Sequence, residues 1–299
     1  MSRRAGTVLA LAGAAVAVAL GARGAAAQDW LEMSTARQVD GIQKVRMHVE
    51  YGAGELTIRP AREGDLYDAR FRYDASRFEP VRSYDLTSGT ARVRLGVRSL
   101  NGKDGVHLDW RDLSSGDFHT ENSGSLQVGL SRDVPTDLRV TVGAARNRMK
   151  LGGIPLTSMI LETGASETAL DFSEPNPARM DELRIKAGAA SLDAENLGNA
   201  HFQSLRVEGG VGDVTLDFSG RWTTDAKGSI HVGLGSLSLH FPPDLGVEID
   251  KSTVLASFSA AGFVKTADGY RTRNWDSAEH HLELEINAAF GSIDVEVGP

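Results

Sequence analysis

The chain has 299 residues, a formal net charge of −8 and no cysteine. Its acidic balance repels phosphate backbones and argues against nucleic-acid binding. The absence of cysteine excludes disulfides, cysteine nucleophiles, thiolate metal sites and iron–sulfur clusters, so a packed core or a long hydrogen-bonded ladder must supply the stability.

The start of the sequence, up to Ala27, has the pattern of a secretory signal peptide. Arg3 and Arg4 give a positive start, an apolar run covers Thr7–Leu20, and Ala25–Ala27 is a small-residue cleavage site. The apolar run is shorter than the roughly 20 residues that span a bilayer, so we expect cleavage after Ala27 and no transmembrane segment in the mature chain. Cleavage leaves 28–299 and removes three arginines and no acid, which takes the net charge from −8 to −11. The sequence thus predicts an exported protein, periplasmic or extracellular at the cell surface.

Residues 28–131 are predicted to form a β-rich N-terminal region. Three runs alternate apolar and polar residues, as strands with one polar face do. They cover residues 69–73, 91–95 and 106–110. A loop rich in Ser, Gly, Asp and Asn follows at 111–124. We place a boundary near residue 131, between this region and a repeat domain at 132–299.

A repeated motif dominates the second region and occurs once in the first. Each copy has a small residue, with one apolar pair at −5 and −3 and usually a second pair at +4 and +6. The small residues are Gly52, Gly143, Gly164, Gly188, Gly210, Gly235, Ser252 and Ala289. The pairs around the fifth of them are Leu205 with Val207 and Val214 with Leu216. The polar exceptions at +4 are Asn147 and Thr168.

The motif predicts a parallel β-solenoid in which each copy stacks on the next. A spacing of two residues is the strand period, and glycine at the small position permits positive φ or a tight corner. From Gly143 to Gly235 the copies recur at steps of roughly 21–25 residues, a period typical of stacked coils. We therefore expect an all-β fold with a single-stranded parallel β-helix. An antiparallel sandwich is the alternative, and its hairpin signals, Asn101-Gly102 and Asp104-Gly105, lie outside the regular repeats.

Two segments resemble a known family. Gln43–Ile58 resembles the opening of the N-terminal domain of bacterial toast-rack proteins, and Leu205–Phe218 resembles the related putative-adhesin β-helix repeats. Those repeats are also similar to the C-terminal domain of cell-envelope stress regulators. The resemblance spans most of residues 36–299, implies a right-handed β-helix at the cell envelope, and supplies no catalytic residues. The chain lacks the transmembrane helices of the regulators, which weakens the transfer of a signalling role.

The sequence contains none of the common catalytic motifs that would identify an enzyme class. The sequence has no H-E-x-x-H, no G-x-S-x-G nucleophile elbow and no phosphate-binding loop. Gly209–Asp213 resembles part of the calcium-binding nonapeptide but occurs once, with its Asp in the fifth rather than the sixth place. The eight histidines are interpreted as scattered surface residues. We assign no catalytic, cofactor-binding or metal-binding residue.

Three acidic residues share one position of the motif. Asp171, Glu195 and Asp217 all stand at +7, so they should point outward and form a column about 4.8 Å apart. Lys150 occupies the same place in the preceding unit. The favoured interpretation is a solvated or paired surface, while a cation site or a catalytic carboxylate pair is the alternative.

Aromatic and basic residues admit two interpretations each. Trp110, Trp222 and Trp275 could stack on sugar rings, but we expect them to cover exposed core. The arginines that alternate with apolar residues in the N-terminal region are expected to form a solvated strand face. They are Arg70, Arg72, Arg92 and Arg94.

The sequence favours a non-enzymatic exported solenoid of the cell envelope. Its role would be structural, adhesin-like or that of an interaction module, with a protein or glycan partner and no cofactor. The alternatives are a polysaccharide-active enzyme that uses the acidic column, and a component of an envelope-stress sensor.

Overall fold

The structure is a computed structural model that describes residues 29–100, 124–267 and 269–298. The predicted signal peptide lies outside these residues. So do Trp110, the predicted strand at 106–110, both hairpin signals and all but the last residue of the predicted loop at 111–124.

The described residues form fifteen strands and two short 3-10 helices, which confirms the all-β prediction. The N-terminal strands are β1 (Trp30–Gln38), β2 (Lys44–Pro60), β3 (Asp65–Asp74), β4 (Phe78–Thr87), β5 (Thr90–Ser99) and β6 (Ser125–Leu130). The long strands of the stack are β7 (Thr136–Lys150), β8 (Leu156–Asp171), β9 (Met180–Glu195), β10 (Phe202–Asp217), β11 (Ala226–Phe241), β12 (Gly246–Ala261) and β15 (His281–Val297). The short elements are η2 (Leu197–Ala200), β13 (Phe263–Lys265), β14 (Tyr270–Thr272) and η3 (Trp275–Ser277).

All strands belong to one mixed sheet. From β2 through β12 the long strands pair in parallel, as expected for a stack of coils. The sheet as a whole is mixed, because β1, β3, β4, β13 and β14 pair antiparallel at its two ends. Two of these pairs, β4–β5 and β13–β14, join consecutive strands through short connections, which can only make antiparallel pairs. The handedness of the helix stays a prediction.

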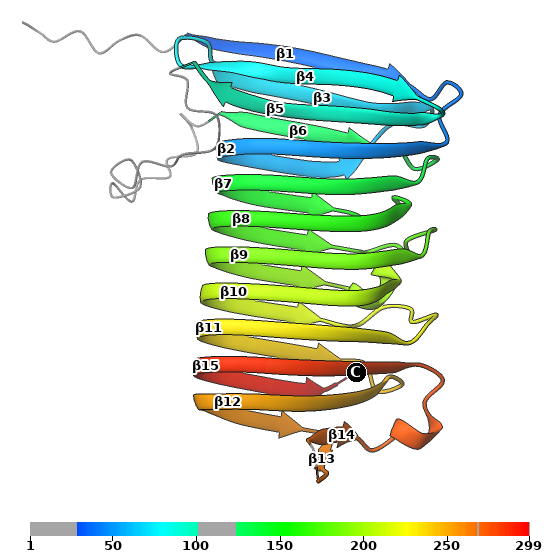
Figure 1. Cartoon of the computed structure of the whole chain (residues 1–299), viewed down its shortest axis with the longest axis vertical. Helices are drawn as coiled ribbons and strands as arrows, with labels where there is room; N and C mark the ends of the chain where they lie inside the picture. Colours follow the sequence, from blue (N-terminus) through cyan, green and yellow to red (C-terminus); the bar gives the residue numbers. More distant parts are fainter. Residues whose placement is uncertain (1–28, 101–123, 268, 299) are drawn as a thin grey trace, which may run out of the picture.

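The last two long strands are not stacked in chain order. The order is β11–β15–β12, so the C-terminal strand lies between two strands that precede it in the sequence (Figure 1). The expectation that each copy stacks on the next is therefore wrong for these copies. A repeat length fixes the path of one coil but carries no information about which coil fills the neighbouring position.

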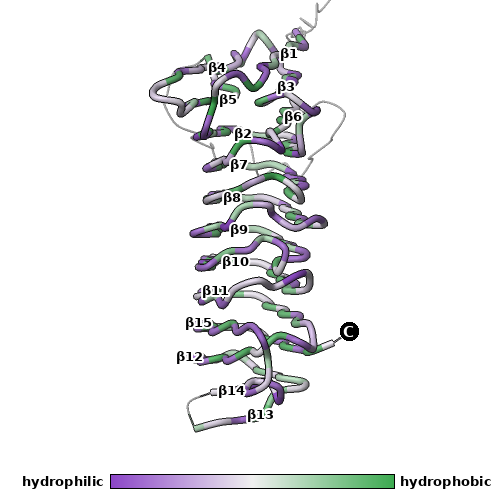
Figure 2. The backbone as a smooth tube through the Cα atoms, turned by 90° about the vertical axis from the view of Figure 1, so that its right-hand side faces the viewer, coloured by the Kyte–Doolittle hydropathy of each residue, from purple (hydrophilic) through white to green (hydrophobic). Residues whose placement is uncertain are grey.

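Each long strand continues through the predicted corner and bends there, so one strand serves two faces of the stack (Figures 1 and 2). In two copies, the small residue that the motif identifies as the corner lies two positions away from the residue that the strand register places level with the neighbouring corners. Gly233 rather than Gly235 lies level with Gly210, and Val254 rather than Ser252 lies level with Ala289. A shift of two positions leaves every side chain on its own face, so the apolar pattern cannot reveal it.

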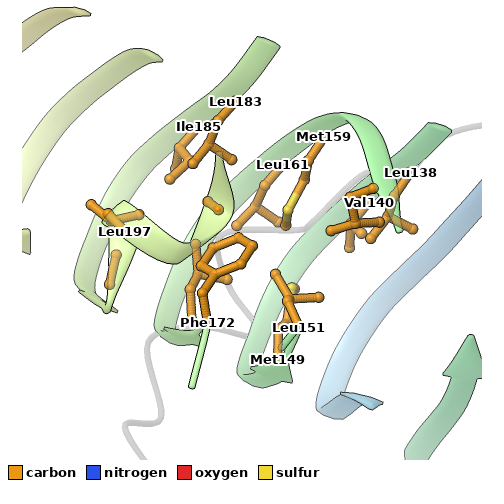
Figure 3. Close-up of a cluster of buried hydrophobic side chains, with 14 of the residues drawn as sticks. Leu138, Val140, Met149, Leu151, Met159, Leu161, Phe172, Leu183, Ile185 and Leu197 are labelled. Carbon is orange, nitrogen blue, oxygen red and sulfur yellow. The ribbon is translucent and has the colours of Figure 1, made fainter. Parts of the chain in front are cut away.

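The core fills the space between the two faces. Side chains of equivalent positions line up in successive coils, with Phe172 and Leu197 beside them from the connecting segments (Figure 3). Among these aligned residues are Leu138, Val140, Met159, Leu161, Leu183 and Ile185, each at most 2% exposed. The inward positions that the motif predicts are therefore confirmed, except that Ala256 and Phe258 on β12 are only half-buried.

Candidate functional site

A groove of about 1180 Å³ follows the bend along the stack. We call it the bend groove. Its floor holds residues from the position before each bend, which are Val142, Thr163, Ala187, Gly209, Val232 and Ala288. The outward residue one place earlier in each strand forms its polar wall, which consists of Thr141, Glu162, Lys186, Glu208, His231 and Asn287.

The strand register stacks the wall residues into one column. Each member faces the next across neighbouring parallel strands, from Thr141 on β7 to Asn287 on β15. Neighbouring strands lie about 4.8 Å apart, so the wall offers a polar group at that interval. Because the same position of the motif recurs once in each coil, its residues form a linear array along the stack.

The wall carries charges of both signs that compensate one another. Glu208 forms ion pairs with Arg184 at 3.0 Å and with Lys186 at 3.5 Å. Desolvation opposes ionisation of Glu208, but the hydrogen bonds and charges of these two partners outweigh it and lower the pKa of the carboxyl. Glu162 lies 3.5 Å from Arg139 in the same way. The wall therefore presents hydrogen-bonding groups without a large net field.

An apolar ridge lies immediately beyond the groove, on the residue after each bend. Val211, Leu234, Phe290 and Leu255 face one another in register on β10, β11, β15 and β12. Their exposed fractions are 53%, 51%, 47% and 69%. In β9, β8 and β7 the same column holds alanine. A contiguous row of exposed large apolar side chains is typical of an interaction surface, whereas single exposed apolar residues are common on any protein.

Glycines next to the ridge let the coils approach closely. Gly212, Gly235 and Gly291 have φ of 136°, 143° and 125°, a region that other residues rarely adopt. A Cβ at Gly235 would lie 1.8 Å from the carbonyl oxygen of Gly212. The motif permits positive φ at the corner itself, but these positive φ values occur two places after the residues that the strand register places at the corner, which are Gly210, Gly233 and Ala289. Gly235 is the one of the three glycines that the motif identifies as a corner residue.

The acidic column forms in part as predicted. Lys150 faces Asp171, and Asp171 faces Glu195 in register. Asp217, on the next strand, accepts hydrogen bonds from the backbone N–H of Asn196 at 3.2 Å and of Ser219 at 3.0 Å. Desolvation, followed by the charges of Asp193, Asp171 and Asp217, raises the pKa of Glu195.

These contacts give the acidic column a local structural role. Asn196 also donates from its side chain to Asp171 at 3.1 Å, so the carboxylates hold the connection that follows β9. Across the described part of the chain, no three His, Asp or Glu side chains are grouped to hold a metal ion. A cation bound by the column stays a prediction.

Sequence reasoning left the bend groove and the apolar ridge unidentified. A signal for the ridge exists, because Val211, Leu234 and Phe290 are apolar and continue the alternation of the first inward pair of each copy one step past the corner, out of phase with the second pair. The two candidate tryptophans within the described residues, Trp222 and Trp275, are not among the residues that line the groove. Trp222 packs edge-on against Phe202, with ring centroids 5.6 Å apart, and so covers the core.

Two of the alternating arginines of the N-terminal region pair with neighbouring acids. Arg92 lies 3.4 Å from Asp85, and Arg94 lies 3.9 Å from Glu50. Pairs on an exposed strand face of this kind contribute little to stability. They fit the predicted polar strand face better than a basic binding patch.

Bent parallel strands stacked around one core, with hairpins at the ends, define an elongated β-solenoid. The chain belongs to the toast-rack family, since the family described as the N-terminal domain of toast_rack, DUF2154, matches residues 29–195 and 181–240. Among the residues that the structure describes, no helix has the length and hydrophobicity to cross a bilayer.

Solved structures with a similar course of the chain are distant in sequence. A putative cell adhesion protein from Clostridium sporogenes is 16% identical, with 90% of this chain and 100% of that chain covered and a TM-score of 0.48. A putative adhesin from Bacteroides fragilis is 9% identical, with 89% and 97% covered and a TM-score of 0.38. The comparison with curated proteins gives no match.

Proposed function

We propose that this chain is an exported, non-enzymatic binding module of the cell envelope that holds an extended protein or glycan partner along the bend groove. Its predicted signal peptide supports export to the periplasm or cell surface. Residues 28–131 would form its N-terminal region and 132–299 its repeat domain. The pairing of β2 with β7 joins the two in one sheet, so they would act as a single rigid body.

The observation that carries the proposal is the repetition of one site in six successive strands. The groove offers a floor of mostly small residues and one polar wall residue in each coil from β7 through β11 and in β15. A partner with its own regular repeat can meet such an array at many points. Because the wall is built on a hydrogen-bonded sheet, little conformational entropy is lost when a partner binds.

Two other functions receive less support. A polysaccharide-active enzyme would use the acidic column, but Asp171 and Asp217 hydrogen-bond with the connection after β9. A component of a stress sensor would need a membrane partner, which no feature of the described residues identifies.

The experiment is a binding screen of the mature chain, residues 28–299, against envelope polysaccharides and extended peptides. The groove variant replaces both Lys186 and Glu208 with Ala, which leaves the net charge unchanged. Its matched control replaces Lys227 and Glu283 with Ala, an exposed ion pair of 2.6 Å outside the groove. We expect the groove variant to weaken binding about tenfold or more and the control to bind like the wild type. Equal binding by all three proteins would contradict the proposal.

A further inference from the structure

The C-terminal end of the stack has an incompletely covered strand edge. On one side β12 pairs with β15 from Gly246 to Ala261. On the other side only Glu248 and Ile249 pair, with β14. Within the described residues, the outer edge of β12 from Asp250 to Ala261 therefore has no strand partner.

Beyond Asp250 and Lys251, the open edge lacks the features that usually protect an edge. The stretch from Ser252 to Val264 contains neither a charged residue nor a proline. Charges, prolines and bulges are the usual means by which proteins block association at an edge. The segment also includes Leu255, the most exposed member of the apolar ridge.

The core itself is only partly closed at this end. The inward side chains of Ala256, Phe258 and Ala260 are half-buried, whereas Ile293 and Val295 on the neighbouring β15 are 1% and 2% exposed. The β13–β14 hairpin covers one part of the end, with Phe263 against Phe241 at 5.9 Å between ring centroids. The part nearer the bend stays open.

We propose that the open edge of β12 pairs antiparallel with the same edge of a second copy, to form a tail-to-tail dimer. This inference rests on the fold and is independent of the proposed function. Antiparallel pairing of identical strands has a two-fold axis, so each copy offers the surface that the other needs. The two faces of the sheet would continue from one copy into the other.

Two features favour a second copy over a foreign peptide. The whole chain carries a net charge of −8, so copies repel one another over most of their surface, but not where the stretch from Ser252 to Val264 carries no charge. The hairpin lies on the side of the strand connections, as Figure 1 shows. In a two-fold pair, each hairpin therefore lies beside the open bend of the other copy.

The first test is sedimentation equilibrium of the mature chain, residues 28–299, over a range of concentrations. We expect a concentration-dependent dimer. Leu255→Lys with Ser259→Lys, both at exposed positions, should weaken it about tenfold or more, because like charges meet across the axis. The control is Leu234→Lys, the same change on the same ridge two strands from the edge, and it should dimerise like the wild type.

A second test uses the lack of native cysteine. Leu255→Cys, Ser257→Cys and Ser259→Cys are made singly, and at least one should form a disulfide-linked dimer on oxidation. Ser236→Cys, on β11 and away from the open edge, is the matched control and should stay free of cross-links. A wild type that is monomeric at all concentrations, or a dimer lost equally in Leu234→Lys, would overturn the proposal. So would a dimer that survives both lysines and forms no cross-link.

Discussion

Asn147 on β7 donates a hydrogen bond of 2.9 Å from Nδ2 to Oγ1 of Thr168 on β8, inside the core. The two side chains are 1% and 3% exposed, at inward positions where most coils carry an aliphatic residue. They are the two polar exceptions of the sequence motif, and the register places them face to face. Asn147 Oδ1 is buried, and it has no hydrogen-bond partner within the described residues.

This pair predicts a non-additive response to mutation. Thr168→Val should lower the free energy of unfolding by roughly 1–3 kcal/mol, because it leaves the buried amide of Asn147 without its acceptor. Asn147→Leu combined with Thr168→Val should recover most of that loss, since apolar side chains need no partner. Urea unfolding of the single and double variants measures both effects. A double variant as unstable as the sum of the singles would contradict this view of the pair.

The connections between coils depend on a buried asparagine. Asn176 is 2% exposed and donates from Nδ2 to the carbonyls of Leu156 at 2.9 Å and Ala200 at 3.0 Å. Its Oδ1 accepts from the N–H of Leu156 at 3.2 Å. Asn176→Ala should therefore cost about 3 kcal/mol of unfolding free energy, because buried backbone groups in two connections lose their partners. Gln203→Ala, at a residue on the surface of the stack, is the control in the same urea titration and should change stability by less than about 0.5 kcal/mol.

The inward face of the stack could be predicted from the sequence because strand periodicity depends only on alternate residues. Leu205 and Val207 point into the core, as their spacing of two residues predicts. The same alternation cannot distinguish Gly233 from Gly235 as the corner, because both lie on one face. The insertion of β15 could not be predicted, since any long strand with the right inward pairs fits beside any other.

The bend groove depends on neighbours that the sequence does not reveal. Glu162, Lys186 and Glu208 are each separated by a full coil of the chain, and they become one wall only when the register is known. The acidic column was predictable because its members share one offset from the corner. Its hydrogen bonds to Asn196 and Ser219 were not, because the path of a connection is not periodic.

Glu195 should make stability depend on pH. Its pKa is raised above the ordinary 4.5, so the folded state binds the proton more tightly than the unfolded state does. The resulting stabilisation is complete below the ordinary pKa and is lost as the pH rises through the raised pKa. Glu195→Gln should therefore stabilise the protein at neutral pH, by roughly 0.2–1 kcal/mol because the side chain is exposed, and should have little effect below pH 4.5.

Thermal unfolding at the two pH values measures this effect. The control is Glu167→Gln, which removes an exposed ion pair with Arg146 at 2.9 Å and should not raise stability at neutral pH. A gain from Glu195→Gln that is the same at both pH values would show that ionisation of the Glu195 carboxyl is not its cause.

The bend glycines should tolerate substitution according to their backbone and not according to the sequence motif. Gly212 stands two places after the corner residue Gly210 and combines φ of 136° with a Cβ position 1.9 Å from the carbonyl oxygen of Ala190 on the neighbouring coil, so Gly212→Ala should cost at least about 3 kcal/mol. Gly52 is the corner residue of the first copy of the motif and has no atom within 4 Å of its Cβ position, so Gly52→Ala should change stability by less than about 1 kcal/mol. Urea unfolding of the two variants compares them directly. Equal losses would mean that the corner residue of the motif, and not the residue two places later, limits how closely the coils approach.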